Sequence, residues 1–445
     1  MSAFCYYNSA LNIFIAFLKN MSGKDHLIKH GTILLVATIL SGVFNYGYHI
    51  AMVRMLGPED YGALFSLTAL FMIVSLPANT IQTIISKYIS SFMARGEHGK
   101  MSALLARVFL KMLKWLSVGL IVYILSSKMT AGYLNISTVL PVTIIGIVIY
   151  VGLLLPINYG ALQGAQRFTE LGVLQILGAF ARVAFGIILV YFGLGVDGAL
   201  FAALLSCSCV AFVGWWFTRD IWSFRPFAQD IGTKAIYKYF VPVSISYICY
   251  GVVTYIDAVI VKHYFSPLQA GYYSSVSVLG KSFLFAPMAF SGALFPKVSS
   301  RHEQGDTTRH LLTKTLAYSG LVCGAGVLIC FVFAREIISL VIKRADLTEQ
   351  ALNTMVPLLR YMGIAITPYG LACIVINYHL AKHWTKFLPY LVASTFLQII
   401  LLKIFHETFT QVLTVLFIAG ILILLCGVPA AIMEKLKVKS QRAYR

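Results

Sequence analysis

The sequence is an almost unbroken succession of apolar segments, each roughly 20 residues long and followed by a short polar loop. As a helix, a segment of this length crosses a hydrocarbon core of about 30 Å. A membrane β-barrel would instead show alternating segments of about 10 residues. With 59% hydrophobic and 11% charged residues, the chain departs from soluble proteins. The pattern predicts an all-α polytopic membrane protein. We place its spans at residues 31–53, 62–86, 106–127, 134–156, 171–192, 196–217, 239–262, 270–295, 311–334, 354–378, 386–404 and 411–433.

A polar hinge separates the first two apolar segments at residues 54–62. Gly57 and Pro58 interrupt the helix, and the proline can begin the next one. Two acidic residues then fall in the first turn, where the helix dipole favours negative charge, before the motif closes at Gly62. The same pattern returns in weaker form at residues 262–271.

A second internal repeat follows in the same order along the chain: residues 157–168 are matched by residues 376–387. Two repeats in one order indicate a duplicated unit. Met21 is a candidate true start, because residues 1–20 fit a signal peptide poorly. The predicted divisions are an N-terminal tail (1–30), an N-lobe (31–218), a cytoplasmic linker (219–238), a C-lobe (239–433) and a basic cytoplasmic tail (434–445).

The formal net charge of +19 reflects Lys and Arg concentrated in alternate loops. The positive-inside rule then predicts a multi-pass protein of the cytoplasmic (inner) membrane with both termini in the cytoplasm. No basic, aromatic-rich nucleic-acid-binding module is present, so we expect membrane lipids and not nucleic acid as partners.

Polar and charged residues within the spans are candidates for a cavity. A mid-bilayer charge costs roughly 2.5–3.5 kcal/mol, so each needs a partner or a watery chamber. Lys281 has two interpretations: a structural ion pair with Asp257, or a cationic cavity wall. Arg182 is similar, although Gly178 and Gly186 beside it also permit close helix contact. The predicted cavity residues are Lys281, Arg182, Asp257, Asn79, Gln82 and Ser277.

Other basic residues gather at the predicted cytoplasmic mouth. Lys87 and Lys297 follow corresponding spans of the two lobes, and Arg107 and Lys111 lie one helical turn apart. One interpretation is snorkelling to anionic lipid head groups. The other is a ring of cations that attracts a phosphate-bearing cargo.

Several kinds of chemistry have no motif in the chain. There is no phosphate-binding Walker loop, no metal-ligand spacing and no Gly-x-Ser-x-Gly elbow. The eight cysteines include no CxxC pair, which favours free, packed thiols. We therefore expect no enzyme activity, no cofactor and no metal.

Three stretches carry a family resemblance. Residues 54–90, 159–168 (with Gly164 and Arg167) and 257–273 resemble polysaccharide-biosynthesis membrane proteins. These are O-antigen-type flippases of the multidrug/oligosaccharidyl-lipid/polysaccharide exporter superfamily. The resemblance covers about residues 28–435. Larger cell-wall precursor flippases have fourteen spans, whereas this chain has twelve predicted ones.

The resemblance implies two pseudo-symmetric six-helix lobes around a central cavity, with alternating access. Its implied cargo is an undecaprenyl-diphosphate-linked oligosaccharide, an anionic lipid-linked glycan moved from the inner to the outer leaflet. A proton or sodium gradient is the candidate energy source, and other polysaccharide-assembly membrane proteins are candidate partners. In this interpretation Lys281 and Arg182 hold the diphosphate or acidic sugars.

Two alternatives stay open. A cation-coupled multidrug exporter of the same fold predicts acidic residues in the lumen, where only Asp257 qualifies. A membrane glycan polymerase or ligase predicts catalysis at an outside loop, and residues 335–353 are the candidate. That loop has room for a small interfacial helix.

Overall fold

The computed structural model describes residues 26–222, 233–303, 308–342, 348–382 and 384–425. Within these ranges the chain is helical almost throughout and contains no strand. Residues 1–25 of the predicted N-terminal tail, which include Met21, lie outside the described residues, as do the middle of the predicted linker and the predicted C-terminal tail. The boundary of the first tail was wrong, because α2 begins at His26.

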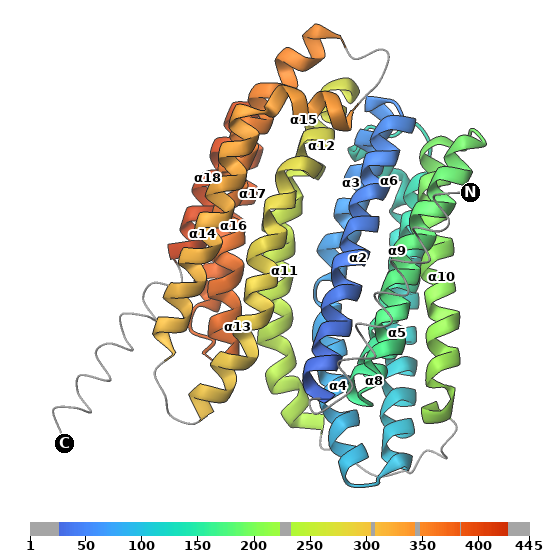
Figure 1. The fold of residues 1–445 in the computed structure, drawn as a ribbon. Helices are drawn as coiled ribbons and strands as arrows, with labels where there is room; N and C mark the ends of the chain where they lie inside the picture. The colour runs from blue at the N-terminus through green and yellow to red at the C-terminus, as the bar shows by residue number, and fades with distance from the viewer. Residues whose placement is uncertain (1–25, 223–232, 304–307, 343–347, 383, 426–445) are drawn as a thin grey trace, which may run out of the picture.

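Two groups of helices stand side by side in Figure 1, the first half of the chain on one side and the second half on the other. They correspond to the predicted lobes. The N-lobe contains α2 (His26–Met55), α3 (Pro58–Ser75), α4 (Ala78–Ala94), α5 (His98–Leu125), α6 (Ser127–Tyr133), α7 (Leu140–Gly152), α8 (Leu155–Gly164), α9 (Phe168–Tyr191) and α10 (Gly195–Trp222). The C-lobe contains α11 (Thr233–Tyr264), α12 (Pro267–Lys281), the 3-10 turn η1 (Ser282–Leu284), α13 (Phe285–Glu303), α14 (Arg309–Val332), α15 (Ala334–Val341), α16 (Glu349–Ala381), α17 (Leu388–Ile404) and α18 (Phe409–Leu425).

The described helices account for all twelve predicted spans. Nine helical stretches among the described residues are long and apolar enough to cross a membrane, and α17 and α18 are shorter apolar helices. The remaining span is α12–η1–α13, which is interrupted beside Lys281. The protein is therefore a multi-pass membrane protein, with large apolar side chains exposed on its surface, such as Leu125 (80%) and Leu321 (71%).

Some predicted boundaries were wrong. The second span is broken at Pro77 into α3 and α4, and it continues to Ala94 instead of ending at residue 86. The tenth begins at Glu349 instead of residue 354 and continues straight through Pro357 and Pro368. Polar residues at the ends of these helices extend them beyond the apolar segment from which the spans were read.

Both predicted hinges begin a helix. Gly57 has an extended backbone (φ −65°, ψ 161°), and Pro58 occupies the first turn of α3. In the second hinge, Ser266 and Gln269 form a capping box, and the Ser266 hydroxyl accepts a hydrogen bond from the Gln269 backbone at 3.3 Å. Each hinge thus turns the chain back into its lobe. We call the end of the bundle that holds both hinges the hinge end, and the other the far end.

The two hinges pack directly against each other. A Cβ atom added at Gly271 would lie 2.0 Å from the Pro58 carbonyl oxygen, and one at Gly62 would lie 3.0 Å from the Gly271 nitrogen. Helix α3 accordingly packs on both α11 and α12. The two lobes therefore touch backbone to backbone at the hinge end, which only glycine permits at this distance.

Further contacts close the hinge end between the lobes. The Arg54 guanidinium donates hydrogen bonds to the carbonyl oxygens of Val341 (2.9 Å) and Leu340 (2.6 Å) at the end of α15. The Asn135 amide donates to the His263 carbonyl oxygen at 2.9 Å. The His263 ring stacks on Tyr133 with centroids 3.9 Å apart. Helix α15 confirms the small helix expected in the 335–353 loop.

The glycine contact gives a first prediction. Gly271→Ala places a methyl group against the Pro58 carbonyl, so we expect it to lower stability by about 1–3 kcal/mol through overpacking. The measurement is the melting temperature of the purified protein in detergent. Gly42→Ala is the matched control, because nothing lies within 4 Å of that site. Equal melting temperatures for the two variants would contradict the close crossing.

Candidate functional site

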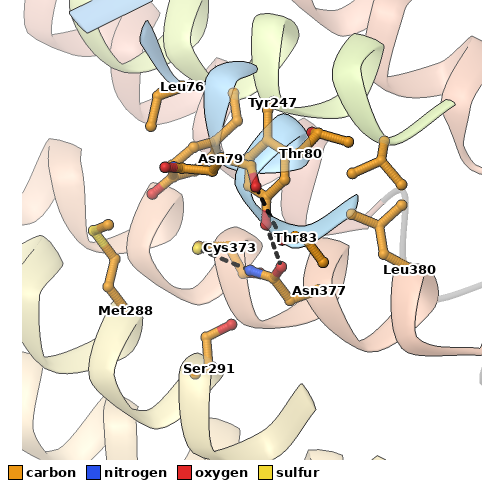
Figure 2. A pocket seen from close by; sticks show the side chains of 13 residues that line it. Leu76, Asn79, Thr80, Thr83, Tyr247, Met288, Ser291, Cys373, Asn377 and Leu380 are labelled. Carbon is orange, nitrogen blue, oxygen red and sulfur yellow. Dashed lines mark hydrogen bonds between the residues drawn. The ribbon is translucent and has the colours of Figure 1, made fainter. Parts of the chain in front are cut away.

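A pocket of about 380 Å³ lies between the lobes, away from the hinge end. Its N-lobe wall comes from the end of α3 and from α4, and its C-lobe wall comes from α11, α13 and α16 (Figure 2). Its size falls toward the lower end of small-molecule sites. The lining residues are Leu76, Asn79, Thr80, Thr83, Val243, Tyr247, Tyr250, Met288, Ser291, Gly292, Cys373, Asn377 and Leu380.

The wall from α4 is polar because Asn79, Thr80 and Thr83 fall on one helical face. The Thr83 hydroxyl donates to the Asn79 carbonyl oxygen at 2.9 Å. Gln82 lies outside this lining and instead donates a hydrogen bond to the Gln163 side chain of α8 at 2.9 Å. The sequence therefore found the polar face of this span, but only Asn79 of its two predicted cavity residues lines the pocket.

The wall from the C-lobe is held in place by a chain of hydrogen bonds. The Tyr247 hydroxyl donates to Asn377 Oδ1 at 3.3 Å. Asn377 Nδ2 in turn donates to the Cys373 carbonyl oxygen at 3.0 Å and contacts the Cys373 sulfur at 3.4 Å (Figure 2). These bonds fix the orientation of the amide. Sequence reasoning missed all three residues as pocket residues, although Asn377 stands in the second internal repeat.

Of the two interpretations of Lys281, the structure has the ion pair with Asp257, and neither residue lines the pocket. Lys281 Nζ lies 2.8 and 2.9 Å from the two Asp257 oxygens, and the Tyr273 hydroxyl donates to the same carboxylate at 2.7 Å. The side chains are 8% and 0% exposed. Lys281 therefore presents no unpaired charge in this conformation.

The ion pair lies between the pocket and the hinge end. Asp257 is seven residues beyond Tyr250 on α11, which corresponds to a rise of about 10 Å. Lys281 Nζ is also 5.6 Å from the ring centroid of Phe65, on α3 of the other lobe. The N-lobe thus covers the pair while the hinge end is closed. Ser277, one turn before Lys281, is fully buried and lies outside the pocket lining.

Arg182 lies within the N-lobe and not in the pocket lining. Its guanidinium stacks over the Tyr48 ring at 4.2 Å, and its buried Nε atom makes no hydrogen bond with any described residue. The neighbouring glycines do permit close contact, as predicted. Added Cβ atoms at Gly178 and Gly186 would lie 2.9 Å from Val210 and from Tyr48, respectively.

The predicted mouth residues are distributed over two N-lobe helices. Lys87 is exposed on α4, one turn beyond Thr83 on the face that includes Asn79. Arg107 and Lys111 are exposed on α5. The side chain of Lys297 is outside the described part of the structure. Lys87 is thus a cation on the same helix face as the pocket.

The loop residues Gly164 and Arg167 hold the N-lobe together. A Cβ at Gly164 would lie 2.6 Å from the Ser86 carbonyl oxygen, so α8 approaches the backbone of α4 closely. The Arg167 guanidinium donates to the Phe217 carbonyl oxygen at 2.8 Å and pairs with the Asp220 carboxylate on α10. Gly164 positions α8 against α4, the helix that carries one pocket wall, whereas Arg167 ties the loop before α9 to α10.

Within the described ranges, no three His, Cys, Asp or Glu side chains could hold a metal ion. The six cysteines described there are all free, as predicted: Cys207, Cys209, Cys249, Cys323, Cys330 and Cys373.

Solved structures with the same fold include a transporter of the MOP superfamily. An inward-facing multidrug resistance MATE family transporter shares 13% identity, with a TM-score of 0.76 over 92% of this chain and 99% of that one. The lipid II flippase MurJ, in an inward closed conformation, shares 14% identity, with a TM-score of 0.69 over 90% and 87%. A Vibrio cholerae MATE transporter, VcmN, shares 15%, with a TM-score of 0.63 over 90% and 97%. The chain therefore has the MOP transporter fold.

The family follows from the sequence comparison. A model of polysaccharide biosynthesis proteins matches residues 51–347, from the end of α2 to beyond α15, and the chain belongs to this family. No curated individual protein matches the chain significantly.

The buried ion pair gives a second prediction. Either Lys281→Met or Asp257→Asn alone should lower stability by roughly 3–5 kcal/mol, because breaking a buried pair leaves unmatched polar groups. The double variant should recover most of the loss, since neither charge remains. Melting temperatures of the three variants in detergent measure this coupling. If the melting temperature of the double variant does not exceed that of the less stable single variant, the two residues do not act as a pair.

Proposed function

We propose that the protein is a flippase that moves a lipid-linked oligosaccharide across the membrane by alternating access. The chain belongs to a polysaccharide-biosynthesis family, and its two lobes touch at one end. The observation that carries this proposal is the pocket between the lobes beyond that contact, in which amide and hydroxyl groups stand among apolar side chains. The resemblance of the sequence to O-antigen-type flippases gives the cargo as an undecaprenyl-diphosphate-linked glycan.

The physical problem is the transfer of a hydrophilic head group through hydrocarbon. Unpaired polar groups and charges are costly there, so the head group needs a polar path inside the protein. The pocket supplies amide and hydroxyl groups from both lobes. The lipid tail can remain in the bilayer, so the pocket need hold only part of the cargo.

Rocking of the lobes would expose the pocket to each side in turn. Opening the hinge end requires loss of the two Arg54 hydrogen bonds, of the Asn135 hydrogen bond, and of the hydrogen bond and ring stack between His263 and Tyr133. Such contacts are individually worth about 0.5–1.5 kcal/mol, so they are reversible. The same motion would withdraw Phe65 from Lys281 and uncover the ion pair.

The distribution of basic loops supports the direction of transport. It assigns the far end to the cytoplasm, where cargo would be loaded, and the hinge end to the outside. Lys87, Arg107 and Lys111 would attract the diphosphate at this entrance. Lys281 and Arg182 would contact anionic groups only in a conformation that opens the hinge end.

A multidrug exporter is the rival function, because MATE transporters share the fold. An exporter of cationic drugs would be expected to place acidic groups in the pocket. The described lining contains none, which favours the glycan carrier. Proton-dependent efflux of a cationic dye by the reconstituted protein would favour the rival.

The third prediction tests alternating access. Tyr133→Cys with His263→Cys, joined by a short bis-methanethiosulfonate cross-linker, should lock the hinge end closed because the native rings stack there. We expect flipping of lipid-linked oligosaccharide in proteoliposomes to fall to background, as measured by periodate oxidation of the glycan from outside. The control is the protein with only one of the two substitutions, Tyr133→Cys or His263→Cys, treated with the same reagent. It should retain flipping.

Removal of the cross-link with reductant should restore transport. If the uncross-linked protein does not raise glycan exposure above that of protein-free vesicles, the flippase proposal fails. If the cross-linked protein still flips, the lobes do not alternate at this contact.

A further inference from the structure

The pocket contains buried hydroxyl groups that make no close hydrogen bond within the described part of the structure. Thr80, Ser291 and Tyr250 line it and are only 1%, 2% and 5% exposed. Their hydroxyl oxygens make no hydrogen bond that meets geometric criteria with any described residue. The Cys373 thiol lies beside Tyr250 and Ser291, but a thiol is a weak hydrogen-bonding group. The Thr254 side chain also lies beside Tyr250, but its hydroxyl already donates to the Tyr250 carbonyl oxygen at 2.7 Å. Buried polar atoms of this kind call for a partner in the pocket.

The unsatisfied hydroxyls come from both lobes. Thr80 belongs to α4, whereas Tyr250 and Ser291 belong to α11 and α13. Asn79 and Asn377 add an amide from each side. A ligand that satisfies the whole set must therefore offer several donors and acceptors on opposite edges.

The pocket is also uncharged. None of its described lining side chains is acidic or basic. The nearest buried charges on α11 and α12 are the mutually neutralising Asp257 and Lys281. An anionic diphosphate in this pocket would lose its hydration without gaining a cation, which is strongly unfavourable.

Cationic groups begin where the pocket ends. Lys87 is four residues beyond Thr83 on α4, a rise of about 6 Å toward the far end. Its side chain is exposed. A molecule with an uncharged polar ring joined to a diphosphate could therefore place the ring in the pocket and the diphosphate at Lys87.

We propose that this pocket is a subsite for an uncharged sugar ring of the cargo, and that the diphosphate binds outside it, at Lys87. The proposal rests on the proposed function and assigns the two parts of the cargo to different residues. Sugar hydroxyls both donate and accept hydrogen bonds, as the Asn, Thr, Ser and Tyr groups of the pocket do. The Tyr247 and Tyr250 rings offer apolar surface to the ring carbons.

The test uses the full-length protein in nanodiscs and two separate probes. The first probe is a panel of methyl glycosides of neutral hexoses and N-acetylhexosamines, followed by saturation-transfer NMR. The second is inorganic pyrophosphate, followed by ³¹P line broadening. At least one glycoside should bind the wild-type protein, and pyrophosphate should not displace it.

Substitutions in the pocket and at Lys87 should affect the binding of the two probes differently. Asn79→Ala or Asn377→Ala should weaken glycoside binding at least tenfold and leave pyrophosphate binding within twofold. Lys87→Gln should do the reverse. Thr83→Ala is a second pocket variant that leaves the Tyr247–Asn377 bond intact, should Asn377→Ala unfold the protein. Thr414→Ala is its matched control, because that exposed threonine also bonds only to the carbonyl four residues earlier.

Two results would overturn the proposal. One is the absence of binding by every glycoside of the panel. The other is loss of pyrophosphate binding in the pocket variants, which would place the phosphate within the pocket. Glycoside binding without flipping in proteoliposomes would refute the proposed function and leave the subsite standing, so the two failures can be distinguished.

Discussion

The architecture depends on the backbone contact between Gly62 and Gly271. Any side chain at Gly271 would collide with the Pro58 carbonyl, so two helices from different lobes meet there with nothing between them. Both partners belong to the duplicated hinge motif, so each lobe presents the same element to the other. The contact closes one end of the bundle and leaves room for a pocket between α4 and the C-lobe beyond it. Buried apolar residues from both lobes, such as Leu64 and Val276, join in one cluster around this crossing.

Much of the fold was readable from the sequence because it is dictated by local physics. Long apolar segments must be helical in a membrane, and a Gly-Pro or Ser-Pro pair must end one helix and begin another. What the sequence could not give was the exact course of the spans. The 3-10 turn after Lys281 and the break at Pro77 depend on packing between helices, whereas Pro357 and Pro368 lie in a helix that continues past them.

The candidate site was predicted less completely, for a physical reason. The need of a buried charge for a counter-ion is a strong rule, and it made the pair with Asp257 one of the two interpretations of Lys281. A pocket made of neutral groups gives no comparable signal in the sequence. Tyr247 and Asn377 are single polar residues on apolar helices, and nothing local distinguishes them from residues that bond within a closed bundle. Only the convergence of α4, α11, α13 and α16 reveals that they face one space.

The internal neutralisation of Lys281 by Asp257 has an electrical consequence. A charge that crosses the membrane field gains or loses about 2.3 kcal/mol per 100 mV. Because both members of the pair sit on the same lobe and sum to zero, their movement during rocking transfers no net charge through the field. The pocket wall contributes none either. At this site, the return of the empty transporter would therefore not depend on the membrane potential. The potential would act there only on the charge of the bound cargo.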